Sequence, residues 1–144
     1  MEEKIRPLAI CLFRRGERIL VMEGYDPTKR ERFFRPLGGG IEFGERGWET
    51  VQRELREEIQ AEAQDIRYLF TLENIFTFNG QRGHEIVLVY DGSLGDESLY
   101  EREVIEGTEY DPFCKTPMRA RWMRADEFGK GGAILYPIGL LERL

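Results

Sequence analysis

The sequence has 144 residues, which suits one domain spanning residues 1–144 and leaves too little chain for a second core. Hydrophobic residues make up 41% and charged residues 33%, a balance that excludes a disordered chain and indicates a globular protein. The formal charge of −6 opposes binding to polymeric nucleic acid, because non-specific binding to a phosphate backbone depends on lysine and arginine. The protein could still bind a small polyphosphate if a divalent cation lies between the negative charges of the two.

The first residues show no signal for a membrane or for export. The longest early apolar run, residues 8–13, is far shorter than the roughly 20 residues that a membrane span needs. Residues 1–4 lack the basic flank of a signal peptide. The cysteines, Cys11 and Cys114, have neither metal-ligand spacing nor the density of a disulfide framework. We therefore expect a cytoplasmic protein with free thiols and no membrane partner.

Strands and turns alternate over the first third of the sequence. Two apolar runs flank Gly16, which predicts an antiparallel hairpin. A polar stretch with Pro27 predicts a loop, and three consecutive glycines after the next strand predict a flexible turn. The expected elements are strands at 8–14, 18–23 and 32–37, a loop at 25–31 and a turn at 38–40.

Residues 48–63 form the clearest helix in the sequence, because they carry helix formers and neither glycine nor proline. The rest of the chain is mostly β-like, with a turn at Asn79 and Gly80. The fold predicted from this pattern is a mixed sheet packed against one principal helix and a few lesser ones. The expected elements are strands at 66–72, 74–78, 85–91 and 119–124, a loop at 94–117, and short helices at 125–128 and 138–144.

The principal helix has two stripes when its residues are placed at about 100° each. An apolar stripe should face the sheet. A carboxylate stripe lies beside it, at the edge where helix meets sheet. Like charges at these spacings oppose helix formation by a few tenths of a kcal/mol per pair, so the carboxylates need a positive partner. The apolar stripe is Val51, Leu55 and Ile59, and the carboxylate stripe is Glu54, Glu57 and Glu58.

Two interpretations of the carboxylates are open on the helix alone. In the first they are solvated surface charges, with Arg53 forming i, i+4 ion pairs with Glu49 and Glu57. In the second they bind Mg²⁺ or Mn²⁺, which prefer oxygen ligands and complete their shell with water and substrate phosphates. The glycines at 38–40 favour the second interpretation, because they can bring main-chain groups close to a ligand or metal.

The spacing of Gly39, Glu45 and the run 53–61 is similar to the Nudix box. The chain thus resembles the Nudix (MutT-like) hydrolases, which act on nucleoside diphosphates linked to another moiety, and every charged position of the box is present. Residues 33–36 and Arg121 with Trp122 also resemble family members. One position departs from the box: Gln60 replaces the usual glycine. Glycine permits a left-handed helix end, so glutamine predicts either a longer helix or an end with mild strain.

The resemblance implies an α/β (α+β) fold of the Nudix type, an α/β/α sandwich with a mixed β-sheet and the Nudix-box loop and helix. It implies Mg²⁺- or Mn²⁺-dependent hydrolysis of a diphosphate linkage by attack of water on phosphorus, with a small nucleotide or nucleotide conjugate as partner. The implied metal-binding residues are Glu54, Glu57, Glu58 and the main-chain carbonyl of Gly38 or Gly39. The implied structural residues of the box are Gly39, Glu45 and Arg53, which hold the loop against the helix.

The general base is not fixed by the box, since family members take it from the helix or from a loop outside the box. On the helix the candidates are Glu54, Glu57 and Glu58. In the predicted loop 94–117 they are Glu103, Glu106 and Glu109, and among these we select Glu106.

Four residues outside the box are candidates for contact with the substrate, and each has an ordinary structural alternative. Arg35 could contact a phosphate or form a strand-edge ion pair. Phe76 could stack on a base or belong to the core, as could Phe78 and Trp122. His84, the single histidine, could take part in proton transfer or lie at the surface, and Glu85 could approach the metals.

Two other functions are compatible with the sequence: a non-catalytic nucleotide-sensing module of the same fold, and an RNA 5′-end pyrophosphohydrolase. Intact box carboxylates oppose the first, and the acidic charge opposes the second. A homodimer is also compatible with the sequence. Substrate selectivity depends on loops whose conformation cannot be derived from it.

Overall fold

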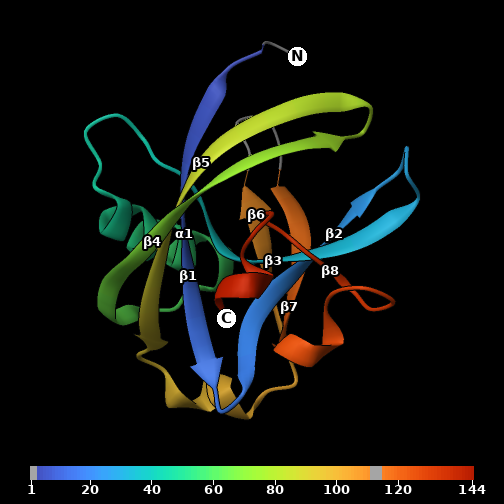
Figure 1. Ribbon diagram of the computed structural model, residues 1–144. Coiled ribbons are helices and arrows are strands. Elements are labelled where there is room, and N and C mark those ends of the chain that lie inside the picture. Colours follow the sequence, from blue (N-terminus) through green and yellow to red (C-terminus); the bar gives the residue numbers. More distant parts are fainter. Residues whose placement is uncertain (1–2, 111–114) are drawn as a thin grey trace.

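The computed structural model describes residues 3–110 and 115–144, which form a twisted mixed β-sheet with one α-helix on one of its faces (Figure 1). The strands are β1 Ile5–Arg15, β2 Arg18–Asp26, β3 Glu31–Gly40, β4 Ala63–Phe78, β5 Gln81–Leu94, β6 Val104–Tyr110, β7 Lys115–Arg124 and β8 Ile134–Leu135. The helix is α1 Gly47–Ile59, and the 3₁₀ turns are η1 Glu97–Glu101, η2 Ala125–Glu127 and η3 Leu141–Arg143.

The strands follow the order β4-β5-β1-β3-β2-β7-β6, and β8 pairs with β3. The β1–β5 and β3–β8 pairs are parallel, whereas the other strand pairs are antiparallel. The hairpins predicted around Gly16 and at Asn79 with Gly80 are present, with positive φ at all three residues. The mixed sheet and its helix confirm the predicted fold class.

Strand β1 lies between β5 and β3, and its residues 8–13 are buried on both faces. Ala9, Cys11 and Phe13 belong to a cluster with the apolar stripe of α1, and the even residues of this run pack on the other side with Leu140. This double burial explains why residues 8–13 form one continuous apolar run instead of an alternating pattern. Cys11 is a buried free thiol, as expected, whereas Cys114 lies outside the described residues.

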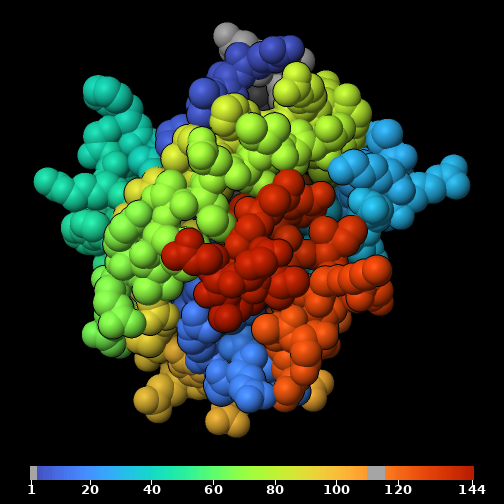
Figure 2. All heavy atoms as spheres, in the orientation of Figure 1, coloured from blue at the N-terminus to red at the C-terminus, as the bar shows by residue number. Residues whose placement is uncertain are grey.

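The C-terminal segment covers the face of the sheet opposite α1 (Figures 1 and 2). Leu140 is completely buried there, and the main-chain N–H of Ile138 donates to Asn74 in β4 at 3.0 Å. In the described residues, short 3₁₀ turns therefore form the layer that the expected α/β/α sandwich has on this face of the sheet. The helix predicted at 138–144 is reduced to η3, since Pro137 and Gly139 interrupt the preceding chain. No helix in the described ranges is both long and apolar enough to cross a membrane.

Three predicted boundaries were wrong near the functional residues. The glycines at 38–40 are the end of β3, because main-chain pairing with β1 continues through them. Helix α1 ends at Ile59 instead of residue 63. The segment predicted as a loop at 94–117 contains η1, β6 and the beginning of β7, so Glu106 and Glu109 lie in a strand.

Candidate active site

Helix α1 is held against the sheet by its apolar stripe, as the sequence predicted. The side chains of Val51, Leu55 and Ile59 are buried in one cluster with residues of β1, β2 and β7. The helix begins at Gly47, and Glu49 accepts a hydrogen bond at 2.9 Å from the main-chain N–H of Arg46. Glu49 thus caps the helix start and is not the partner of Arg53 that the surface-charge interpretation required.

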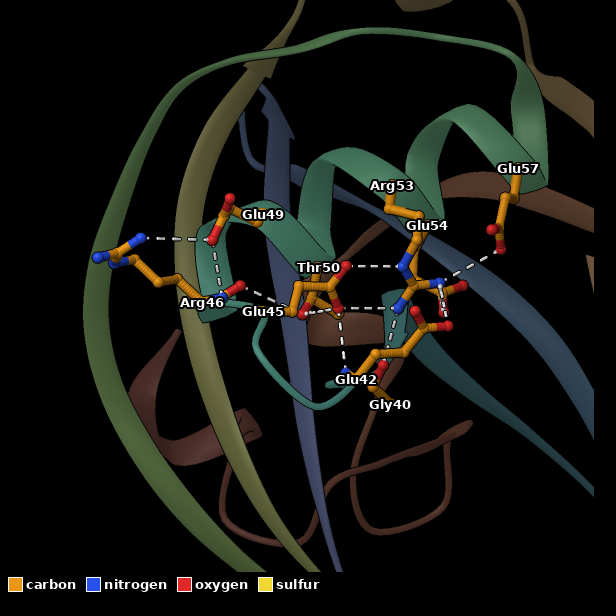
Figure 3. A network of polar contacts seen from close by, with 9 residues as sticks. All are labelled: Gly40, Glu42, Glu45, Arg46, Glu49, Thr50, Arg53, Glu54 and Glu57. Atoms are coloured by element: carbon orange, nitrogen blue, oxygen red, sulfur yellow. Dashed lines mark hydrogen bonds and ion pairs between the residues drawn. The ribbon is translucent and has the colours of Figure 1, made fainter.

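Arg53 links α1 to the loop that precedes it (Figure 3). Its Nε donates to Glu45 Oε2 at 2.8 Å, and its Nη2 donates to Glu45 Oε1 at 3.0 Å and to the carbonyl of Gly40 at 2.9 Å. A guanidinium that binds both oxygens of one carboxylate is a strong and directional contact. The structure therefore joins Glu45 and Arg53, and through them it fixes the loop 41–46 against the helix.

Glu45 accepts two further hydrogen bonds in this loop. The Thr50 hydroxyl donates to it at 2.6 Å, and the main-chain N–H of Glu42 donates at 3.1 Å. The bond from Arg53 is the main cause that lowers the pKa of Glu45 to about 2, against the opposing effect of burial. Glu45 therefore remains ionised over the physiological pH range and serves as a fixed anchor for Arg53.

Arg53 also contacts the carboxylate stripe (Figure 3). Its Nη1 donates to Glu54 at 3.0 Å and to Glu57 at 3.4 Å. The Glu54 side chain is 16% exposed and the Glu57 side chain 41%. Burial raises the pKa of Glu54, and Arg53 opposes this shift. Gly39 lies directly against Glu54, because a Cβ at Gly39 would collide with that carboxylate. The stripe therefore stands at the junction of helix and sheet, as predicted.

Glu58 is the most deeply buried carboxylate of the three. It is 2% exposed, and its Oε1 has no hydrogen-bond partner. Burial raises the pKa of Glu58 to about 8, although Arg35 and the main-chain amide of Gly38 both lower it. A buried carboxyl oxygen without a partner costs free energy in the folded state, so Oε1 of Glu58 is an oxygen donor that a cation could use.

Arg35 and Glu109 face each other beside Glu58. Arg35 Nη2 donates to Glu109 Oε1 at 2.5 Å, across 74 positions of sequence. Strand β6, which carries Glu109, packs on α1 at Gly107, where a Cβ would collide with the main-chain carbonyl of Glu58. Glu109 was one of three acidic residues named in the predicted loop, and only the strand pairing identifies it as the one that reaches the site.

Glu106 does not lie with these residues. It is exposed and pairs with Arg119 in the β6–β7 register. Its neighbour Gly107 faces α1, and alternate residues of a strand point to opposite faces. The catalytic role selected for Glu106 thus stays a prediction that the geometry does not support, and Glu109 is better placed.

A family model of the NUDIX domain matches residues 4–137. The chain belongs to the Nudix family. This membership confirms the resemblance seen in the box, and it indicates a hydrolase that acts on the pyrophosphate bonds of nucleoside diphosphate derivatives.

Solved structures share the Nudix fold with this chain at low sequence identity. A MutT NUDIX hydrolase from Burkholderia pseudomallei is 20% identical with a TM-score of 0.61, and the match covers 89% of each chain. The ORF135 protein of E. coli is 20% identical with a TM-score of 0.56, covering 96% of this chain and 87% of the other. A NUDIX hydrolase from Nitrosomonas europaea is 18% identical with a TM-score of 0.58, covering 86% and 75%. No curated protein sequence matches the chain.

Two of the four substrate-contact candidates lie away from the Nudix helix. Glu85 shares the sheet face of Val87, which is opposite α1, and it forms an ion pair with Arg6 at 3.8 Å and a hydrogen bond with Asn74 at 3.2 Å. His84 is half-buried between Ile5 and Ile75 in the strand register, at the N-terminal end of β1. Neither residue is brought to the box carboxylates.

The aromatic candidates are packed against protein. Phe76 covers Gly83 of β5, and its ring centroid lies 6.4 Å from that of Tyr136. Trp122 is buried in the main core and stacks on Tyr100 at 5.3 Å. The core interpretation therefore fits Trp122, whereas Phe76 is only half-buried in its contact with Tyr136. Of the four substrate-contact candidates, only Arg35 joins the box carboxylates.

The donor set of the Nudix helix fits a divalent cation. Among residues 3–110 and 115–144, no three His, Cys, Asp or Glu side chains already stand in a group that could hold a metal ion. Two of the three box carboxylates are bonded to Arg53, whose Nη1 donates to Glu54 and Glu57. The donors are nonetheless oxygen atoms within one helical turn, and the free Oε1 of Glu58 is one of them. Such a set suits Mg²⁺ or Mn²⁺.

Proposed function

We propose that this protein hydrolyses the diphosphate linkage of a small nucleoside diphosphate derivative, using Mg²⁺ or Mn²⁺ and attack of water on phosphorus. The observation that carries the proposal is the partnerless oxygen of Glu58, buried between α1 and β3 beside the Glu54 carboxylate. A structural carboxylate has no reason to remain unpaired there, whereas a metal ligand must keep an oxygen free.

The residues that would hold the cation are Glu54, Glu57, Glu58 and the main-chain carbonyl of Gly38 or Gly39. When bound, the metal supplies charge neutralisation at the phosphoryl oxygens and lowers the pKa of water. Gly39 contributes by having no side chain, which leaves room for the Glu54 carboxylate. Arg53 holds the box loop and donates hydrogen bonds to Glu54 and Glu57, which offset part of their negative charge.

We assign proton removal from the attacking water to Glu57. A general base must come within hydrogen-bond distance of a water that enters with the substrate. Glu57 is 41% exposed, whereas Glu54 and Glu58 are turned into the helix–sheet junction. Arg35 is the cation available to a phosphate of the substrate, since its half-buried guanidinium lies beside these carboxylates.

The test is a panel of nucleotide sugars, dinucleoside polyphosphates, ADP-ribose, nucleoside triphosphates and 5′-triphosphorylated RNA, assayed with Mg²⁺ and with product identification. We expect turnover of at least one small compound, and a loss of two to three orders of magnitude in kcat for Glu57→Gln. Glu49→Gln is the matched control, because Glu49 belongs to the same helix but caps its start. Full activity of Glu57→Gln would exclude this site. Nucleotide binding without hydrolysis of any compound would support a sensing module instead.

A further inference from the structure

The Arg35–Glu109 pair joins two strands that are not neighbours. Strand β3 carries Arg35, strand β6 carries Glu109, and β2 and β7 lie between them in the sheet. In a flat sheet the two backbones would be roughly 14 Å apart, at about 4.8 Å per strand. The sheet must therefore curve around the α1 face, so that the two side chains meet above it. On the intervening strands, buried Met22 lies opposite Arg35 and buried Ala120 lies opposite both Met22 and Ile105.

Arg35 lies close to the metal-binding carboxylates without bonding to either of the buried ones. Its guanidinium bonds to Glu109, which lies two residues along β6 from Gly107, and Gly107 packs against the main chain of Glu58. Yet Oε1 of Glu58 remains without a partner. A guanidinium beside an unpaired, desolvated carboxylate gains free energy by forming an ion pair with it. Another contact must therefore keep the Arg35 guanidinium from forming an ion pair with Glu58.

Glu109 provides that contact, and the position of β6 is fixed independently of the pair. Gly107 lets β6 approach α1 so closely that any side chain there would strike the carbonyl of Glu58. Ile105, on the same face of β6, is buried in the core cluster of the helix. Packing thus fixes the β6 backbone from which the Glu109 side chain extends, and the carboxylate can act as a partner for Arg35.

We propose that Glu109 is a positioning residue that holds Arg35 away from Glu58, so that the buried oxygen stays available to a cation and the guanidinium stays available to a phosphate. The inference rests on the proposed function and deepens it. Without Glu109, Arg35 would pair with Glu58 and compete with the metal. With Glu109, one small cluster can hold a cation and an arginine side by side.

The test measures Mn²⁺ binding to the full chain by calorimetry or electron paramagnetic resonance, without nucleotide. Glu109→Gln is expected to weaken Mn²⁺ binding about tenfold, because it releases Arg35 toward Glu58. The double variant Arg35→Gln with Glu109→Gln is expected to recover the wild-type affinity. Arg35→Gln alone should bind Mn²⁺ at least as tightly as the wild type. The matched control is Glu101→Gln, which removes one exposed negative charge from η1 and should leave binding unchanged.

The outcomes separate this inference from the proposed function. If wild-type protein binds no Mn²⁺, both fail. If it binds Mn²⁺ and Glu109→Gln binds equally well, only the role of Glu109 is overturned. Weak binding that persists in the double variant would also overturn it, because a general loss of negative charge or of β6 packing does not depend on Arg35. Thermal unfolding of each variant, measured beside the titration, identifies a variant that has lost its fold, and Arg35→Gln then still tests the competition.

Discussion

Gln60 ends helix α1 in a left-handed conformation, and its side-chain amide donates to the main-chain carbonyl of Glu57 at 3.1 Å. Its φ of 52° and ψ of 39° are those that a glycine adopts at a helix end. The main-chain N–H of Gln60 still bonds to the carbonyl of Arg56. Of the two alternatives that the sequence left open, the helix thus takes the strained end, and the side chain compensates by satisfying a carbonyl of the last turn.

We expect Gln60→Gly to make the protein about 0.5–1 kcal/mol more stable, since glycine adopts positive φ without steric cost. The entropy that glycine adds to the unfolded chain limits the gain. Gln60→Ala is the control, because it keeps the strain and loses the amide bond, and it should be less stable than the wild type. The measurement is the urea concentration at the unfolding midpoint of the wild type and of the two variants. A Gln60→Gly variant no more stable than Gln60→Ala would show that the backbone here is not strained.

The Nudix box could be predicted from sequence because its interactions are local. The apolar stripe, the carboxylate stripe and the Glu45–Arg53 pair all lie within residues 39–61, where helical periodicity sets the geometry. The same periodicity placed Glu58 beside the core. Helical periodicity could not predict how deeply Glu58 is buried, because its burial depends on the packing of β3 and β6 against the helix.

Strand β6 and its contacts could not be predicted, because its sequence does not alternate. The run from Val104 to Tyr110 contains charged residues, a glycine and a threonine, which resemble a loop. Pairing with β7 and contact with α1 make it a strand despite this composition. Because this strand was not predicted, the face that each of its residues occupies was unknown. The sequence therefore offered no ground to select Glu109 instead of Glu106 as the residue that reaches the site.

Arg53→Met should destabilise the protein by about 1–3 kcal/mol, because it leaves the Glu45 and Glu54 carboxylates without their shared cation. Arg56→Met, one turn away, is the matched control. The Arg56 side chain bonds to exposed Glu62, and such surface pairs contribute roughly 0–1 kcal/mol. Chemical denaturation of both variants at pH 7 gives the comparison. Equal losses would mean that the Arg53 network contributes no more than a surface ion pair.

Glu45 should make stability depend on acid pH. Its pKa is lowered to about 2 in the folded protein, from an ordinary value of 4.5. The folded state therefore binds this proton less readily, so the stabilisation is complete above pH 4.5 and is lost as the pH falls toward 2. Between pH 6 and pH 3 the loss attributable to Glu45 should be about 1–2 kcal/mol. Unfolding free energies measured at both values should fall less in Glu45→Gln than in the wild type, and an equal fall would contradict the assignment.

Glu58→Gln should separate stability from activity. With a pKa of about 8, Glu58 is largely protonated in the folded metal-free protein at pH 7, whereas it is ionised in the unfolded chain, so folding must take up a proton. An amide of nearly the same shape removes this cost, and we expect metal-free Glu58→Gln to be about 1–2 kcal/mol more stable than the wild type at pH 7. Hydrolysis should fall by at least two orders of magnitude, because a metal ligand is lost. Added Mg²⁺ should raise the unfolding temperature of the wild type by mass action and leave that of Glu58→Gln almost unchanged. Equal stabilisation of both proteins by Mg²⁺ would show that the cation binds elsewhere, and the buried oxygen of Glu58 would then need another explanation.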